Sequence, residues 1–146
     1  MATFGTSPLY RVEFVNHSNT EINFDLRDIS GDPGNFGNVA PGATATSHDW
    51  RPPVTDIERG NVAVVGIGQF GQPQLVPAPG VRFWSGESSH GIGTDQYINL
   101  LEGNGWKVTR NTSLISEVTG NGFRVTVDGG GSQPETNGIY FQVYNV

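Results

Sequence analysis

Alternation of apolar and polar side chains is the clearest pattern in this 146-residue chain. Near the start, Tyr10, Val12 and Phe14 alternate with charged residues, and residues 20–28 repeat the alternation. A period of two residues is typical of a β-strand with one buried and one wet face. We therefore predict that these two runs form a β-hairpin around a polar turn at residues 16–19.

The rest of the chain has the same short-range character. Segments rich in Gly, Pro, Ser and Asn predict loops at residues 30–42, 69–80 and 86–94. The pairs Asn104-Gly105 and Asn121-Gly122 each precede an aromatic residue and predict type I′ turns. Further strands are predicted at residues 43–50, 61–68, 81–85, 95–101, 106–110, 113–118, 123–127 and 139–146.

No long segment has a helical period with capping residues. We therefore expect an all-β, single-domain antiparallel β-sandwich of about ten short strands over residues 9–146. Residues 1–8 are expected to form a flexible N-terminal arm. We expect the last strand to lie inside its sheet, because its apolar pattern continues to the final residue.

Composition and charge exclude several classes of partner. The formal net charge is −6, Lys107 is the only lysine, and no Lys/Arg run supplies a patch for nucleic acid or anionic lipid. No cysteine is present, which excludes disulfides and thiolate chemistry. Neither a signal peptide nor a transmembrane segment is visible, so we expect cytoplasmic synthesis and leave the final location open.

Enzymatic chemistry is poorly supported by the motifs. Ser88, His90 and Asp95 bring hydroxyl, imidazole and carboxylate together, but the Gly86–Gly91 segment does not match the Gly-x-Ser-x-Gly nucleophile turn. The acidic residues and histidines have no metal-ligand spacing. We therefore expect neither an enzyme nor a metal site nor a cofactor.

Carbohydrate binding needs only an exposed aromatic face with hydrogen-bonding side chains beside it. Two clusters supply these residue types, one around Trp50 and one around Trp84. The alternative for each tryptophan is a place in the core, and Trp106 fits the core best because it follows a tight turn. The candidate ligand-binding residues are Asp49, Trp50, Arg51, Arg82, Trp84, His90, Asp95 and Tyr97.

Three functions from different classes remain open. The leading hypothesis is a lectin-like glycan-binding protein that forms a homo-oligomer. The alternative is a self-assembling coat, filament or inclusion subunit, because lysines that guard strand edges are scarce. A membrane-active toxin of the small β-sandwich kind is a weaker alternative.

The order of elements in the first half carries one resemblance. The segment YRVEFVNHSNTEINFDL, the turn Ala40-Pro41-Gly42 and the strand GNVAVVGIG resemble small β-sandwich proteins of the actinoporin, aegerolysin and fungal-lectin kinds. These strand and turn features are generic, so they single out no family and carry over no residue roles. An actinoporin-like toxin would also need an amphipathic helix ahead of the first strand, for which eight residues leave no room.

Two glycosylation sequons are present, Asn16-His17-Ser18 and Asn111-Thr112-Ser113. Both are predicted to lie in exposed turns. They matter only in a glycosylating pathway, and without a visible signal peptide we expect them to be unused.

Overall fold

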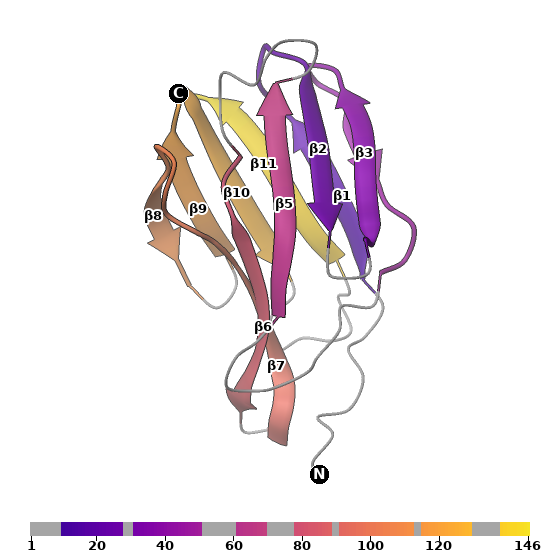
Figure 1. Ribbon diagram of the computed structural model, residues 1–146, viewed down its shortest axis with the longest axis vertical. Coiled ribbons are helices and arrows are strands. Elements are labelled where there is room, and N and C mark those ends of the chain that lie inside the picture. Colours follow the sequence, from indigo (N-terminus) through magenta and orange to yellow (C-terminus); the bar gives the residue numbers. More distant parts are fainter. Residues whose placement is uncertain are drawn as a thin grey trace.

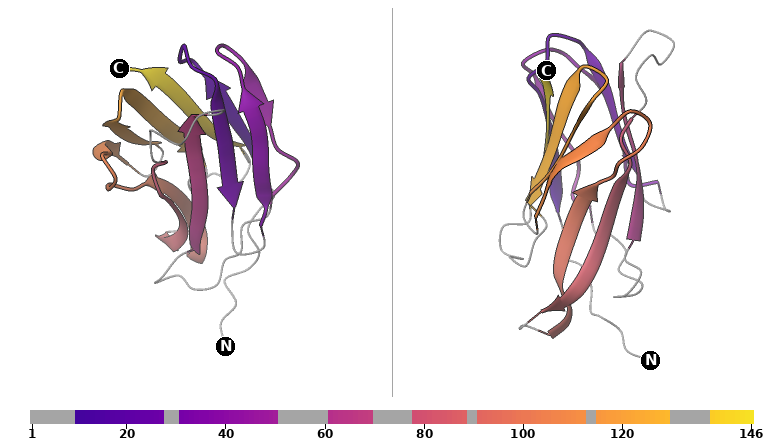
Figure 2. Two further views of the ribbon diagram at one scale, coloured as in Figure 1. Left: turned by 45° about the horizontal axis from the view of Figure 1, so that its top comes forward. Right: turned by 90° about the vertical axis from the view of Figure 1, so that its left-hand side faces the viewer.

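The computed structural model describes residues 10–27, 31–50, 61–69, 78–88, 91–112, 115–129 and 138–146, with the backbone alone at residues 61–69, 83–88, 91–97 and 129. This part of the chain forms eleven β-strands and no helix. The strands build two sheets that face each other as layers of a sandwich (Figure 1 and Figure 2). The predicted all-β fold is therefore confirmed.

Each sheet combines strands from distant parts of the sequence. The six-stranded sheet has the order β4-β1-β11-β10-β9-β8, and the five-stranded sheet has the order β3-β2-β5-β6-β7. The strands of the six-stranded sheet are β1 (Arg11–Asn16), β4 (Thr44–Thr46), β8 (Lys107–Asn111), β9 (Ile115–Gly120), β10 (Phe123–Gly129) and β11 (Gly138–Asn145). Those of the five-stranded sheet are β2 (Ile22–Arg27), β3 (Pro33–Val39), β5 (Asn61–Gln69), β6 (Val81–Ser88) and β7 (Gly91–Leu100).

The final strand, β11, lies in the middle of the six-stranded sheet. It pairs antiparallel with β10 and parallel with β1, in a register that runs from Arg11↔Gly138 to Asn16↔Val143. The expectation that the last strand lies inside the sheet is confirmed. Strand β11 thus joins β4 and β1 to β10, β9 and β8 within one sheet.

The inner faces of the two sheets form one hydrophobic core. Phe24 on β2 stacks on Phe14 of the opposite sheet, with ring centroids 4.3 Å apart, and lies 5.0 Å from the ring of Phe141. Trp106 is buried, as predicted. Burying an apolar side chain of this size contributes about 1.5–3 kcal/mol, so these contacts hold the layers together.

The first two strands have the predicted faces but not the predicted partners. Instead of forming a hairpin, β1 pairs with β4 and β11, whereas β2 pairs with β3 and β5 in the other sheet. The chain crosses between the layers at residues 16–20, where the buried side chain of Asn16 bonds to Thr20, Val39 and Ser18. Asn16 is thus a structural residue, and the prediction that its sequon lies in an exposed turn is wrong.

Two predicted loops contain strands. Residues 33–39 form β3, whose glycines Gly34 and Gly37 adopt positive φ of 93° and 80°. Much of residues 86–94 also belongs to strands, because β6 continues to Ser88 and β7 begins at Gly91. Both predictions failed because turn-forming residues also occur in bulged strands, where glycine meets the unusual backbone angles.

The two Asn-Gly pairs adopt the predicted positive φ angles, 54° at both Asn104 and Asn121. The second pair closes the β9–β10 hairpin, whereas the first lies between β7 and β8, which belong to different sheets. The turns touch, because Asn121 donates from Nδ2 to the carbonyl oxygen of Asn104 at 3.2 Å. This contact joins the crossing between the layers to the hairpin.

Candidate functional site

A β-bulge gives the outer face of the five-stranded sheet a group of carboxamides. In the β2–β3 pair, Asn23 lies opposite Asn38 and Asp25 lies opposite Asn35, with a register shift between them. Asn35 and Asn38 are three residues apart, so a regular strand would place them on opposite faces. The bulge turns both outward while Phe36, between them, packs against the core ring of Phe24 at 4.7 Å.

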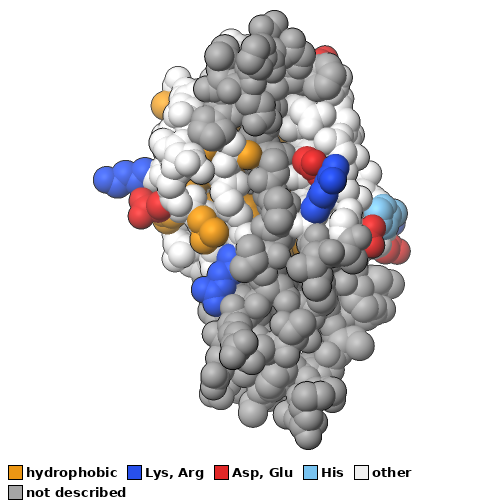
Figure 3. Space-filling view, viewed as in Figure 1, with side chains coloured by type: hydrophobic (Ala, Val, Ile, Leu, Met, Phe, Trp, Pro, Cys, Tyr) orange, Lys and Arg blue, Asp and Glu red, His pale blue; other side chains and the backbone are white. Residues whose placement is uncertain are grey.

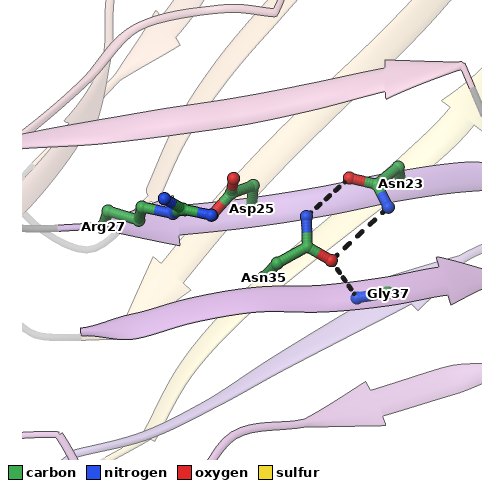
Figure 4. Close-up of polar contacts among 5 residues, drawn as sticks. All are labelled: Asn23, Asp25, Arg27, Asn35 and Gly37. Atoms are coloured by element: carbon green, nitrogen blue, oxygen red, sulfur yellow. Dashed lines mark hydrogen bonds and ion pairs between the residues drawn. The ribbon is translucent and has the colours of Figure 1, made fainter. Parts of the chain in front are cut away.

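Hydrogen bonds hold these carboxamides in place, and Figure 4 shows those among Asn23, Asn35 and Gly37. Asn35 donates from Nδ2 to Oδ1 of Asn23 at 2.8 Å, and Asn23 donates from Nδ2 to Oδ1 of Asn38 at 3.2 Å. The Oδ1 atom of Asn35 also accepts a 2.6 Å bond from the backbone N–H of Gly37 inside the bulge. Asn35 and Asn38 remain exposed, so they present fixed donors and acceptors to solvent.

An ion pair continues this face along β2. Arg27 donates from Nε to Oδ1 of Asp25 at 2.8 Å, and Figure 4 shows the two side chains along the same strand as Asn23. The pair carries no net charge and still offers guanidinium donors and carboxylate acceptors. Figure 3, which looks onto this sheet, shows the described charged side chains as a few separate groups, some with both signs side by side.

The neighbouring strand β5 supplies glycines at the matching outer positions. Asn23 lies opposite Gly68 and Asp25 lies opposite Gly66. Residues directly opposite each other in a sheet share a face, so the outer face has no side chain at either position. Asn23 and Asp25 therefore border two outer positions of β5 that have no side chain, whereas Arg27 lies opposite Val64.

The β6–β7 hairpin forms the other end of the same face. Its register pairs Arg82 with Asn99 and Trp84 with Tyr97. Val81, Ile98 and Leu100 are buried, whereas Arg82 and Asn99 are half-buried, so the pair Arg82–Asn99 belongs to the outer face. The hairpin extends past the end of β2 and β3 in Figure 1.

The cluster predicted around Trp50 does not provide a binding surface. The indole of Trp50 is 2% exposed, and its backbone pairs with Tyr10 on the side of the six-stranded sheet. The alternative of a core tryptophan is therefore the correct one at this position. Asp49 is exposed, and its Oδ1 lies 4.0 Å from Nη2 of Arg11 on β1. Strand β1 belongs to the six-stranded sheet, whereas Arg82 lies on the five-stranded one. Arg51 lies outside the described residues.

The remaining candidate ligand-binding residues stay predictions, because the structure does not describe their side chains. His90 lies outside the described residues, and for Trp84, Asp95 and Tyr97 only the backbone is described. The backbone register nevertheless places Asp95 opposite Gly86, two residues from the Trp84–Tyr97 pair. Within the described ranges, no group of three or more His, Asp or Glu side chains could hold a metal ion, and no helix there could cross a membrane.

The outer face of the six-stranded sheet carries a cluster of aromatic, cationic and carboxamide side chains. The ring of Tyr144 stacks on His17 with centroids 4.6 Å apart and has the guanidinium of Arg124 at 4.5 Å. Gln142 accepts hydrogen bonds at 2.9 Å from both His17 and Tyr144. Farther along the face, burial raises the pKa of the Asp128 carboxyl. The contacts among His17, Arg124, Gln142 and Tyr144 stabilise the outer face of this sheet.

Three of the four edge strands of the described part are poor templates for strand addition. The strand β3 is bulged, β4 has three residues, and β8 combines a bulge with Lys107, the chain's only lysine. At the β7 edge the backbone N–H of Leu100 donates to Oγ of Ser116 at 2.9 Å. Short, bulged and covered edges hinder strand-to-strand association.

The carboxamide group of Asn23, Asn35 and Asn38 was not among the residues proposed from the sequence. Alternation places Asn23 on an outer face, but the bulge that brings Asn35 and Asn38 beside it leaves only a Gly/Pro-rich signal, which also indicates a loop. Comparison of the chain with known families and with curated proteins finds no family model and no curated sequence that matches it.

Proposed function

We propose that this protein is a non-enzymatic carbohydrate-binding protein whose site is the outer face of the β6–β7 hairpin. The observation that carries the proposal is the register of the hairpin, which pairs Trp84 with Tyr97 in step with the outer pair Arg82–Asn99. Strand alternation assigns positions 84 and 97 to the same face as 82 and 99. An aromatic pair flanked by a guanidinium and a carboxamide suits a sugar, because the rings stack on its apolar face while the polar groups bond its hydroxyls.

The position of Asp95 adds a carboxylate to the same proposed site, two residues beyond Tyr97 along β7. The chain's net charge of −6 works against anionic ligands, including nucleic acids and acidic lipids, so uncharged glycans are the better match. Trp50 is left out of this site because its indole belongs to the core.

A glycan array tests the proposal. Wild-type protein is expected to bind a subset of glycans, and Trp84→Ala is expected to weaken that binding at least about tenfold, since an interfacial tryptophan is often a dominant contact. Arg82→Ala should weaken it less. The matched control is Arg110→Ala, which removes an exposed arginine from β8 in the other sheet. Folded wild-type protein that binds nothing on the array would refute the proposed function.

Self-assembly through strand edges is the competing function, and it is the less suitable one. Three of the four edge strands described above, β3, β4 and β8, are short or bulged, and the lone lysine lies on one of them. Sedimentation at increasing protein concentration separates the two functions, because a glycan-binding protein stops at a small closed oligomer whereas a coat or filament subunit continues to grow.

A further inference from the structure

We infer that the ligand is an extended, uncharged polysaccharide chain, and that it crosses the five-stranded sheet from the β6–β7 hairpin to the carboxamides of Asn23, Asn35 and Asn38. This inference rests on the proposed function and adds to it a second contact region and a substrate class. The starting observation is that one face holds both groups, because β2, β5, β6 and β7 are neighbours in one sheet.

The printed registers give the distance between the two ends. Asp25 lies opposite Gly66 of β5, and Arg82 lies opposite Val62 of the same strand. With about 4.8 Å between strands and about 3.4 Å per residue, two strand spacings and four residues separate Asp25 from Arg82 by about 17 Å. Trp84 lies two residues farther along β6. A single sugar spans only part of this length, whereas a chain of several sugars reaches both ends.

The register of β5 gives the outer positions between the two ends. Beside Asn23 and Asp25 these positions are glycines, and toward Arg82 they are Val64 and Val62. A polysaccharide chain that crosses the face therefore meets backbone next to the carboxamides and valine positions next to the hairpin, while the bordering polar side chains bond its hydroxyls.

The chemistry of the face selects an uncharged chain. The carboxamides of Asn23, Asn35 and Asn38 each carry donors and an acceptor, which match the mixed character of sugar hydroxyls. Their geometry is fixed by hydrogen bonds of 2.8 and 3.2 Å and by the bond of Asn35 to Gly37, so little side-chain entropy is lost on binding. The Asp25–Arg27 pair is self-neutralised and the chain is acidic, so the described part of this face offers a polyanion little positive charge.

Isothermal titration with neutral oligosaccharides of increasing length, from monosaccharide to hexasaccharide, tests the inference on the full chain. The oligosaccharides are cut from the neutral polysaccharides that the wild-type protein retains in affinity electrophoresis. Affinity is expected to rise with length. The double variant Asn23→Ala/Asn38→Ala is expected to lose about tenfold for the longest ligand and nothing for the shortest, while Trp84→Ala weakens both.

The double variant leaves Asn35 and its bond to Gly37 in place, so the bulge is kept. The single variant Asn38→Ala, which removes one exposed carboxamide, repeats the test if the double variant unfolds in circular dichroism. The control is Asn145→Ala, which removes an exposed carboxamide from β11 in the other sheet.

Three glycan-binding results would overturn the inference. The first is equal affinity for short and long ligands, and the second is unchanged binding of long ligands by the double variant. The third is tighter binding of polygalacturonate or heparin than of neutral chains. In each of these cases short-ligand binding at Trp84 would still uphold the proposed function, which fails if no glycan binds or if Trp84→Ala leaves binding unchanged. A sedimentation change caused by Asn38→Ala, with no change in glycan affinity, would instead assign the face to a second copy of the chain and would also overturn the inference.

Discussion

Replacing Asn16 by alanine should destabilise the protein more than the same replacement of any exposed asparagine of the described residues. Asn16 is fully buried at the crossing from β1 to β2, which joins the two sheets. Its Nδ2 donates to the carbonyl oxygens of Thr20 at 2.8 Å and Val39 at 2.9 Å. Its Oδ1 accepts from the backbone N–H of Ser18 at 2.9 Å and from the Ser18 hydroxyl at 2.6 Å.

The size of the effect follows from these four bonds. A typical intramolecular hydrogen bond contributes about 0.5–1.5 kcal/mol, and a buried partner left unsatisfied costs more. Ser18 keeps its own bonds with Thr20, which reduces the loss. We therefore expect Asn16→Ala to lower the free energy of unfolding by about 2–4 kcal/mol, a large share of the about 5–15 kcal/mol of an ordinary domain.

Urea denaturation followed by tryptophan fluorescence measures this loss. The control is Asn111→Ala, which removes an exposed side chain with a bond to Asn99 and should cost less than about 1 kcal/mol. If Asn16→Ala and Asn111→Ala cost the same, the buried side chain does not hold the crossing between the layers, and the reasoning is refuted.

Three further predictions concern stability and titration. Asp128→Asn should raise the melting temperature at neutral pH, because burial raises the pKa of Asp128 and its Oδ1 has no hydrogen-bond partner among the described residues. A raised folded-state pKa favours the protonated carboxyl in the fold, so the advantage of the variant should shrink as the pH falls towards about 4; an advantage that grows on acidification would contradict this. Gly120→Ala should cost about 2–3 kcal/mol in urea denaturation, since its methyl group would overlap the carbonyl oxygen of Gly105 where the two Asn-Gly turns touch, and an unchanged midpoint would show that the turns can separate freely. Tyr10 is buried and its pKa is raised, so alkaline difference spectroscopy should find that this tyrosine ionises only when the protein unfolds, a signal that Tyr10→Phe removes; its ionisation in the native fold would be inconsistent with this burial.

The strands could be predicted from the sequence better than their pairing. Alternation placed Val12, Phe14 and Phe24 on inner faces, and all three are buried. The same alternation fits a hairpin and a crossing between layers equally well, because both put the apolar sides of the strands against one core. The choice depended on the side-chain bonds of Asn16, which a hydrophobic pattern does not record.

The candidate site could be predicted only in part for a similar reason. Aromatic and charged residue types pointed to both Trp50 and Trp84, but they do not reveal which indole is buried. Trp50 is buried because its backbone hydrogen bonds with Tyr10 hold it beside the start of β1. The carboxamides of Asn35 and Asn38 share a face because of one extra residue in a bulge, and a bulge moves side chains without a distinctive sequence pattern.

Chemical-shift mapping shows directly whether the outer face of the five-stranded sheet binds glycan. Amide resonances of the isotope-labelled chain are followed while a neutral oligosaccharide that binds in the titrations is added. The predicted result is a set of shifts confined to β6 and β7 for short ligands, which spreads across β5 to β2 and β3 for long ones. Shifts concentrated on β8–β11 of the six-stranded sheet, or no shifts at saturating ligand, would contradict the account.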